Sequence, residues 1–333
     1  MGTRAGHETH VSTPETAAPP SPADAIVVGA GPAGLTSALC LARWRRTVVL
    51  LDGGPGRWAH GQRNHNYLGF PGGVTAVELH DRGRRQLDEY PEVTVLPSRA
   101  TGVGRSADGT VSVTLPDGAA VRGAGLVLAT GVRDQFPAFE GSEACVGRSL
   151  FWCIACDGYE SQGTSAVVVG RGREAALEAL QLTRFAPEVT LLVDPADRSS
   201  TDAELAAQLD RYGVRRVTGR LARAVGPDGP PTDGRITAVE LADGTRLAAD
   251  RVFAVGGARP ETALASALGV RLADNGWIEC DTEQRTSVPG VYAAGDVTKP
   301  HGHQVATAAH EGTQAAAAVN FDLYERYDPA LVC

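Results

Sequence analysis

A dinucleotide-binding fingerprint near the N-terminus limits the folds open to this chain more than any other feature. The apolar run Ile26-Val27-Val28 leads into Gly29-Ala30-Gly31-Pro32-Ala33-Gly34 and then into a helical pattern over residues 35–43. The first glycine permits a tight turn, the second lets the backbone approach a pyrophosphate, and the third allows close helix-to-strand packing. A second apolar segment, 47–51, ends at Asp52, where a carboxylate can accept hydrogen bonds from ribose hydroxyls. The pattern predicts an α/β unit that binds a dinucleotide.

The same order of elements returns in the second half of the chain. An apolar strand over 165–169 is followed by Gly170-Arg171-Gly172-Arg173-Glu174-Ala175, a helical pattern to about residue 185 and a strand over 189–193. That strand ends at Asp194, which follows the first glycine by 24 residues, against 23 in the first copy. Two such copies predict two bound nucleotides, or one bound nucleotide and one unit that has lost its ligand.

The remaining segments predict how the two copies are joined. Residues 53–73 are rich in Gly, Pro, Asn and His and predict a long loop that wraps a ligand. Alternating segments at 93–96 and 110–115 predict a small antiparallel meander. The C-terminal part carries a helical pattern over about 305–325 and is too short for a third domain, so we expect it to complete the first unit.

The predicted fold class is therefore α/β, with two Rossmann-like (three-layer ββα) dinucleotide-binding domains, the second inserted in the first. We expect residues 23–133 and 257–333 to form the first domain and residues 134–256 to form the second. Residues 1–22 lack an apolar core segment, so we expect a disordered arm and not a signal peptide or a membrane anchor.

Composition narrows the class of protein further. The chain has 333 residues, of which 43% are hydrophobic, and a net charge of -8 without long blocks of one sign. This distribution argues against a nucleic-acid interface. No apolar run approaches the roughly 20 residues that span a bilayer. The six cysteines show no regular disulfide spacing outside one C-x-x-C pair, so we expect a reducing, cytoplasmic compartment.

That pair, Cys153 and Cys156, is the candidate reactive group. Two cysteines separated by two residues can close a small disulfide, open it and exchange it with another dithiol. Asp157 follows the second sulfur and could handle protons, although Asp-Gly is equally a turn signal. The alternative, half of a zinc site, would need a second C-x-x-C or a His pair at matching spacing, and the sequence has neither.

Together these features resemble the low-molecular-weight thioredoxin reductase family of flavoproteins. The residues that carry the resemblance, in the family's order, are Gly29-Ala30-Gly31-Pro32-Ala33-Gly34, Ala129-Thr130-Gly131, Cys153-Ile154-Ala155-Cys156-Asp157-Gly158 and Ala294-Gly295-Asp296. The resemblance implies FAD on the first domain, NADH or NADPH on the inserted domain, a homodimer, and a thioredoxin-like protein or a small dithiol or disulfide as substrate. It also implies that the inserted domain swings between two poses about hinges near 131–133 and 256–259.

The resemblance also assigns roles to residues. Cys156 would face the flavin, Cys153 would attack the substrate disulfide, and Asp157 would serve as acid and base. The implied FAD-binding residues are Gly29, Gly31, Pro32, Ala33, Gly34, Asp52, Gln62, Asn66, Thr130, Gly131, Gly295, Asp296, His303, Gln304 and Val305. The implied nicotinamide-binding residues are Gly170, Gly172, Ala175 and Asp194.

The second fingerprint departs from the family pattern. Arg171, Arg173 and Glu174 stand where the family has small or neutral residues, and the following strand ends in Val193-Asp194-Pro195-Ala196-Asp197 instead of a basic cluster. This argues against the 2′-phosphate of NADPH and leaves NADH or no nucleotide. Our leading hypothesis is an FAD-dependent disulfide oxidoreductase that passes electrons from a reduced nicotinamide through FAD and Cys153/Cys156 to a thioredoxin-like protein disulfide. The alternatives are a dithiol oxidase that uses oxygen, a ferredoxin-linked reductase, and a non-catalytic FAD-binding redox sensor.

Overall fold

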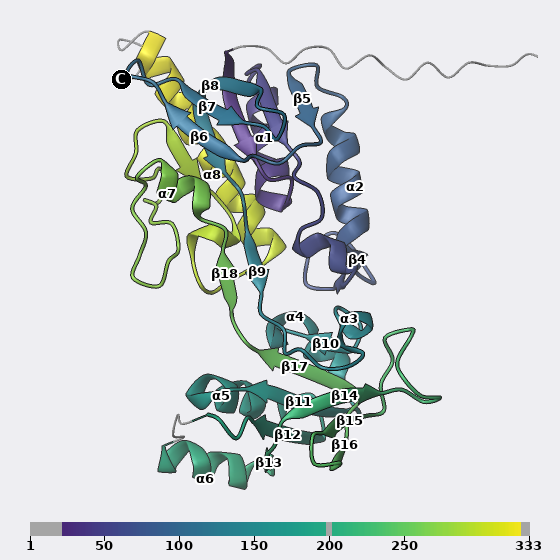
Figure 1. The fold of residues 1–333 in the computed structure, drawn as a ribbon. Coiled ribbons are helices and arrows are strands. Elements are labelled where there is room, and N and C mark those ends of the chain that lie inside the picture. The colour runs from purple at the N-terminus through teal and green to yellow at the C-terminus, as the bar shows by residue number, and fades with distance from the viewer. Residues whose placement is uncertain (1–21, 198–201, 328–333) are drawn as a thin grey trace, which may run out of the picture.

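The computed structural model describes residues 22–197 and 202–327, which form two units joined by a narrow connection (Figure 1). Residues 1–21 of the predicted arm lie outside the described residues. In chain order, the first unit begins with β1 (Ala23–Val28), α1 (Pro32–Arg43), β2 (Val48–Leu51), the short 3-10 helix η1 (Arg57–His60), β3 (Arg63–Asn64), β4 (Val74–Thr75), α2 (Ala76–Leu87), β5 (Val93–Leu96), β6 (Gly102–Arg105), β7 (Val111–Thr114) and β8 (Ala120–Leu128).

The first unit is built on a seven-stranded sheet in the order β5-β2-β1-β8-β7-β6, with β19 (Val291–Ala293) also paired to β8. The pairs β5-β2, β2-β1, β1-β8 and β8-β19 are parallel, while β6, β7 and β8 form an antiparallel meander. The prediction for residues 93–96 was wrong in one respect. They do not join the meander but pair in parallel with β2, and β6 takes the place expected for them.

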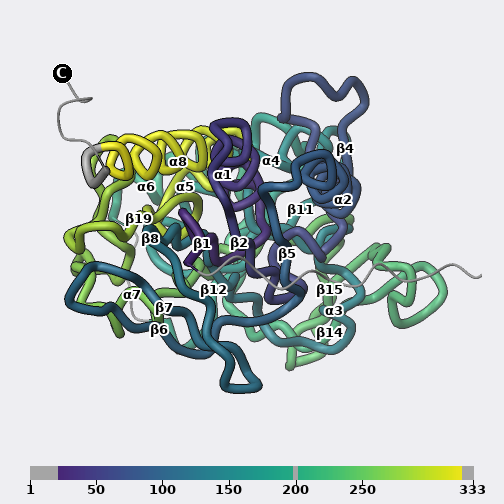
Figure 2. Tube along the Cα trace, turned by 90° about the horizontal axis from the view of Figure 1, so that it is seen from above, coloured from purple at the N-terminus to yellow at the C-terminus, as the bar shows by residue number. Residues whose placement is uncertain are grey.

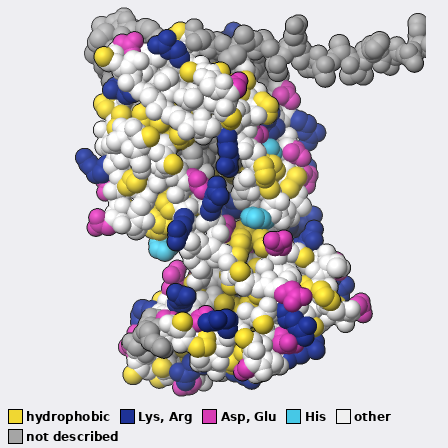
Figure 3. Space-filling view, in the orientation of Figure 1, with side chains coloured by type: hydrophobic (Ala, Val, Ile, Leu, Met, Phe, Trp, Pro, Cys, Tyr) yellow, Lys and Arg dark blue, Asp and Glu magenta, His cyan; other side chains and the backbone are white. Residues whose placement is uncertain are grey.

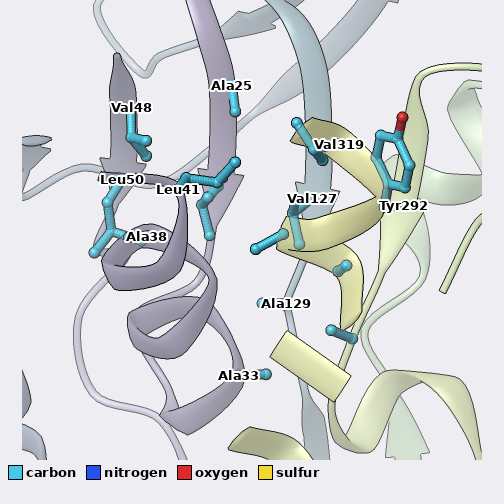
Figure 4. Packing of buried hydrophobic residues seen from close by; sticks show 14 of the residues in the cluster. Ala25, Ala33, Ala38, Leu41, Val48, Leu50, Val127, Ala129, Tyr292 and Val319 are labelled. Carbon is cyan, nitrogen blue, oxygen red and sulfur yellow. The ribbon is translucent and has the colours of Figure 1, made fainter. Parts of the chain in front are cut away.

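Helices cover one face of this sheet, and two of them, α1 and the C-terminal helix, meet over its centre. The C-terminal helix α8 (Val305–Tyr327) lies beside α1, as Figure 2 shows from above. Their shared core contains Ala25, Leu41, Val127, Tyr292 and Val319, part of the cluster drawn in Figure 4. Gly312 permits the close approach, because a Cβ there would lie 2.3 Å from the Ala33 carbonyl oxygen. The start of α8 is thereby held next to the glycine-rich turn.

The second unit is a five-stranded parallel sheet in the order β10-β17-β11-β12-β13 with a three-stranded antiparallel sheet, β14-β15-β16, beside it. Its elements are α3 (Ser142–Cys145), β10 (Leu150–Phe151), α4 (Ile154–Asp157), η2 (Tyr159–Ser161), β11 (Ser165–Gly170), α5 (Gly172–Leu182), β12 (Glu188–Val193), α6 (Ala203–Arg211), β13 (Arg215–Thr218), β14 (Leu221–Val225), β15 (Ala238–Leu241), β16 (Arg246–Ala248) and β17 (Arg251–Val255). Both faces of its parallel strands are buried, in two separate apolar clusters, as is usual for a parallel sheet.

A two-stranded ribbon connects the units. The outgoing strand β9 (Val132–Asp134) pairs antiparallel with the returning strand β18 (Ala258–Pro260), and both run through the waist of the molecule in Figure 1. The chain then passes through α7 (Ala263–Ala267), β19, η3 (Asp296–Thr298) and α8. The predicted α/β fold, with one Rossmann-like unit nested inside the other, is confirmed. Within the described residues, no helix is both long and apolar enough to cross a bilayer.

Candidate active site

One large cavity runs from the first glycine-rich turn to the C-x-x-C pair. Its volume is about 1170 Å³, and its wall includes the turn at Gly29, the η1 loop, the start of α8, and both Cys153 and Cys156. In Figure 3 the upper unit is hollowed on the face shown, and Lys or Arg side chains gather along the hollow. The cavity is large enough for a dinucleotide, and its wall reaches the two sulfur atoms.

The glycine-rich turn leaves room for a phosphate. A Cβ at Gly31 would have no heavy atom within 4 Å, so this position opens into the cavity, whereas a Cβ at Gly34 would lie 1.8 Å from the Gly29 carbonyl oxygen. Gly31 is also the N-cap of α1, whose first turn contains no acidic residue. Free backbone N–H groups and the helix dipole at this end suit an anion. The turn therefore fits the pyrophosphate of FAD.

Most of the residues implied by the resemblance line this cavity. Gln62 does so with a buried side-chain oxygen, Oε1, that has no hydrogen-bond partner, and an N–H group of a bound ring system could satisfy it. The other implied FAD residues on the wall are Gly29, Gly31, Pro32, Ala33, Asn66, Thr130, Gly131, Gly295, Asp296, His303, Gln304 and Val305. Gly34 lies behind the turn, and Asp52 lines a smaller adjoining cavity of about 320 Å³.

Asp52 stands at the end of β2, as predicted, but already has partners in the protein. Its carboxylate accepts from Arg84 Nη1 at 2.9 Å and from the Gly54 N–H at 3.2 Å. His80 lies 3.8 Å away and its ring stacks on Trp58 with centroids 3.8 Å apart. Arg84 and His80 were not predicted, because nothing in the periodicity of α2 indicates which of its turns meets β2.

A second unpredicted group is an arginine shared by two carboxylates on the cavity wall. Arg57 lies in the predicted ligand-wrapping loop, and its Nη1 donates to Asp296 Oδ2 at 2.8 Å. The same guanidinium forms a bidentate ion pair with Asp134 on β9. The Asp134 side chain is only 4% exposed. Burial raises the pKa of Asp296, and the nearby Arg57 partly offsets that rise. Arg57 thus ties the Asp296 turn to the connecting ribbon.

The C-x-x-C pair is a disulfide at the inner end of the cavity. Cys153 and Cys156 are joined across the first turn of α4, with their Cα atoms 5.2 Å apart. Cys153 Sγ accepts from the Cys156 backbone N–H at 3.1 Å. Gln304, just before α8, places its Nε2 3.4 Å from Cys156 Sγ and 3.8 Å from Cys153 Sγ. The pair predicted from sequence and the start of α8 are therefore in contact.

Asp157 is held in an environment that favours its neutral form. Its pKa is raised to about 7, mainly by burial and also by the nearby Glu160, while Arg251 acts in the opposite direction. The carboxyl group lines the same cavity as the sulfur atoms. A carboxyl group with a pKa near 7 can both accept and release protons at neutral pH.

Aromatic rings link the two units beside the disulfide. Trp152 of the second unit packs edge-on against His60 of η1, with centroids 5.7 Å apart, and against Phe136 at 5.2 Å. The Arg57 guanidinium lies 5.8 Å from the centre of the Trp152 ring. Tyr159, on the other flank of the pair, is 71% exposed. Trp152 therefore packs at the boundary between the units, next to Cys153 in the chain.

The second glycine-rich turn differs sharply from the first. The backbone N–H of Gly172, at the start of α5, donates to Asp197 Oδ2 at 3.0 Å, so a carboxylate of the chain itself occupies the place where a pyrophosphate would bind. Arg173 forms an ion pair with Asp202, and Asp194 accepts from the Ala196 N–H at 2.7 Å. The residues described at this turn therefore do not fit a dinucleotide, although Gly170, Gly172, Ala175 and Asp194 have the predicted order.

Comparisons with known proteins agree with this architecture. A thioredoxin reductase of Streptomyces clavuligerus is 30% identical over 304 residues, which cover 87% of this chain and 91% of that protein. The crystal structure of HlmI matches with a TM-score of 0.85 and 31% identity, over 94% of this chain and 96% of that one. The thioredoxin reductase of Streptococcus pyogenes matches with a TM-score of 0.81 and 26% identity, over 91% and 98%.

The family model described as pyridine nucleotide-disulphide oxidoreductase matches residues 23–312. That range includes both glycine-rich turns, the Cys153–Cys156 disulfide and the turn at Asp296. The chain is a flavin oxidoreductase of the thioredoxin reductase type and belongs to the pyridine nucleotide-disulphide oxidoreductase family.

Proposed function

We propose that this protein is an FAD-dependent thiol–disulfide oxidoreductase whose Cys153–Cys156 pair exchanges electrons with a thiol substrate. One observation carries the proposal. The disulfide and the open glycine-rich turn line the same cavity, whose volume of about 1170 Å³ can hold a dinucleotide. In the boundaries that we propose, residues 23–133 and 257–333 bind FAD and residues 134–256 present the disulfide.

The residues that would hold FAD divide along the cavity. The turn at Gly29 and Gly31 would hold the pyrophosphate at the start of α1, and Gln62 would accept from the ring system. Asp296, oriented by Arg57, would bind hydroxyl groups of the cofactor's sugar chain. FAD would supply a centre that accepts or donates two electrons next to the disulfide. The side chains of the protein would position FAD and transfer the protons.

The exchange itself needs only the two sulfurs and a dithiol. A substrate thiolate attacks Cys153 Sγ, the bond between the two cysteine sulfurs breaks, and Cys156 leaves as a thiolate. The second substrate thiolate then attacks the substrate sulfur of this mixed disulfide and releases Cys153 as a thiolate. The substrate is oxidised to a disulfide, the pair is reduced by two electrons, and two protons are released. The same steps in reverse reduce a substrate disulfide.

Asp157 is suited to the proton transfers of this exchange. Its pKa of about 7 means that it is partly ionised at neutral pH, unlike an ordinary exposed aspartate. As a carboxylate it would accept the proton of an incoming thiol, and as a carboxylic acid it would return a proton to a leaving sulfur. Its position, directly after Cys156 on α4, serves either direction of the exchange.

The exchange can run in two directions, reduction of a substrate disulfide or oxidation of a substrate dithiol. Different observations support each direction. The names of relatives such as the thioredoxin reductase of Streptomyces clavuligerus support reduction of a thioredoxin-like protein disulfide with electrons from NADH or NADPH. The Asp197 carboxylate on Gly172 N–H supports the opposite direction, because it fills the place that a nicotinamide nucleotide would need. We favour the second direction, in which a dithiol is oxidised and oxygen accepts the electrons.

Anaerobic titration of the flavin decides between these directions. We expect a dithiol such as dithiothreitol to bleach the flavin, and neither NADH nor NADPH to do so. Bleaching by NADH or NADPH would establish the reductase direction instead. If only reduced ferredoxin bleaches the flavin, the ferredoxin-linked hypothesis replaces both. Absence of turnover with every thiol, disulfide and acceptor would favour the redox-sensor hypothesis.

The homodimer and the cytoplasmic location implied by the resemblance stay predictions. Exposed apolar rings on α8, Phe321 and Tyr324, and on the adjoining end of α1, Trp44, are a natural place to look for a second copy. Sedimentation equilibrium of the FAD-loaded protein measures the oligomeric state directly.

A further inference from the structure

Two side-chain amides connect the first unit to the sulfur atoms of the second. Asn66 Nδ2 donates to Gln304 Oε1 at 2.6 Å, which leaves Gln304 Nε2 directed at the disulfide. A glutamine amide has one accepting and one donating end, so the bond from Asn66 determines which end meets the sulfur. Cys156 Sγ therefore faces the N–H donor of the Gln304 amide and not its carbonyl oxygen.

The two sulfurs differ in their donors. Cys153 Sγ accepts from the backbone N–H of Cys156 at 3.1 Å, a bond internal to the first turn of α4. Cys156 Sγ accepts from Gln304 Nε2 at 3.4 Å, whereas the same nitrogen is 3.8 Å from Cys153 Sγ. The side chain of Gln304 therefore acts mainly on Cys156, and it does so from the other unit.

We propose that Asn66 and Gln304 form a relay that holds an amide donor against Cys156 and stabilises its sulfur as the thiolate when the disulfide opens. A hydrogen bond to a charged acceptor is about twice as strong as one between neutral groups. Gln304 also directly precedes the 23-residue helix α8, whose N-terminal end favours a nearby negative charge. The inference rests on the proposed redox role of the pair and adds two positioning residues to it.

The relay depends on the relative pose of the two units. Asn66 and Gln304 belong to the first unit and Cys156 to the second, which is joined to it by β9 and β18. Rotation of the second unit about this ribbon would separate the donor from the sulfur. Cys156 is thus favoured as a thiolate while it faces the cavity, which is where its electrons would leave or arrive.

Other charged and titratable groups also act on this region, and the test must leave them in place. They include Asp157 on α4, Glu160 on η2 with its neighbour His65, and Arg251 on β17. On the cavity wall they include Arg57, His60, Arg63, Arg133, Asp134, Glu261, Asp296 and His303. Replacing Gln304 with methionine changes none of these groups and retains most of the side chain's volume.

The test is the pH dependence of alkylation of each cysteine in the chemically reduced, full-length protein, resolved by mass spectrometry. Gln304→Met should raise the apparent pKa of Cys156 by about one unit, toward the ordinary thiol value of about 8.5. At pH values below the pKa, a rise of about one unit makes the thiolate fraction of Cys156 about tenfold smaller. The profile of Cys153 should shift less, because its nearer donor, the backbone N–H of Cys156, remains.

A second variant tests the relay in a different way. Asn66→Asp places an acceptor-only group opposite Gln304, so the amide must turn its Nε2 toward residue 66 and its Oε1 toward the sulfur. We expect the Cys156 profile to shift at least as far as in Gln304→Met. The control is Gln314→Met, the same substitution ten residues further along α8, for which we expect no shift.

The relay is refuted if the Cys156 profile is unchanged in both Gln304→Met and Asn66→Asp while their circular dichroism spectra are native. Equal shifts of both cysteines would refute it as well, because they would indicate a general disturbance of α4. The measurement uses neither an electron donor nor an acceptor. A protein that never turns over would therefore contradict the proposed function and leave the relay standing.

Discussion

The carboxylate of Asp197 accepts a hydrogen bond from the backbone N–H of Gly172 at 3.0 Å, at the start of the helix that follows the second glycine-rich turn. In a nucleotide-binding unit this N–H points at a pyrophosphate. The chain thus supplies its own anion at that place. The family's name contains a pyridine nucleotide, and in our proposal this contact disfavours the binding of that nucleotide at the second turn.

Removal of this carboxylate should restore some affinity for a nucleotide. We expect Asp197→Ala to bind NADH at least tenfold more tightly than the unaltered protein, because the N–H becomes free and a like charge is lost. Fluorescence titration measures the affinity. Asp228→Ala, which removes an exposed acid of the same unit, is the matched control and should bind like the unaltered protein. Micromolar binding of NADH to the unaltered protein would show that Asp197 does not close the site.

The pKa of Asp157, about 7, predicts how thiol exchange depends on pH. If the carboxylate accepts the proton of the incoming dithiol, the rate of anaerobic flavin reduction should rise as pH increases through about 7. Asp157→Asn should lose this inflection and react about 100-fold more slowly, a typical loss for a general base. Stopped-flow absorbance between pH 5.5 and 8.5 measures both effects. Retention of the inflection in Asp157→Asn would assign it to another group.

The same shift predicts a gain in stability for that variant. The pKa of Asp157 is raised from 3.8 in the unfolded chain to about 7 in the folded protein, so its ionisation opposes folding. Its contribution is most favourable below pH 3.8 and is lost as pH rises through 7. Asp157→Asn should therefore be more stable than the unaltered protein at pH 8, by on the order of 2 kcal/mol, and this advantage should shrink toward pH 4. Urea unfolding at the two pH values measures it.

The Arg57 ion pairs predict a large loss of stability near the FAD site. Arg57→Met leaves the carboxylates of Asp134 and Asp296 without their shared partner, and the Asp134 side chain is only 4% exposed. Breaking such a pair costs about 3 kcal/mol, and we expect FAD content to fall with it. Arg82→Met is the control, because the Arg82–Glu78 pair is exposed and should contribute less than about 0.5 kcal/mol. Equal thermal shifts for the two variants would contradict this assignment.

Much of this architecture could be predicted from sequence because local signals coincide. At Gly29 to Asp52 the strand, glycines, helix and acid all predict one structure, and the Cys153–Cys156 spacing predicts a pair that can close. The antiparallel meander was assigned the wrong first strand, because a short alternating segment such as 93–96 does not reveal whether its partner is parallel or antiparallel.

The rest of the site depends on contacts between distant parts of the chain. Arg57 contacts Asp296, which is 239 positions away in the sequence. Asp197, which follows β12, contacts Gly172 at the start of α5. No periodicity or motif in the sequence indicates such long-range contacts. The departures from the family pattern at the second turn did mark the unusual region, but only the folded chain shows that the Asp197 carboxylate accepts from the Gly172 N–H, in addition to Glu174 in the first turn of α5.

Serine variants of the two cysteines separate their roles. The sulfur that faces the flavin should perturb its visible spectrum, so Cys156→Ser should change the absorbance band of the FAD-loaded protein more than Cys153→Ser does. The contact of Gln304 with Cys156 supports this order. Identical spectra for the two variants would contradict it.

The most direct test of the central claim is anaerobic reduction of the flavin by dithiothreitol in the FAD-loaded protein and in the double variant Cys153→Ser, Cys156→Ser. We predict that the unaltered protein bleaches with two electrons taken up by the flavin after the disulfide is reduced, and that the double variant does not bleach. Equal bleaching of both proteins would show that electrons reach the flavin without the Cys153–Cys156 pair and would contradict the account.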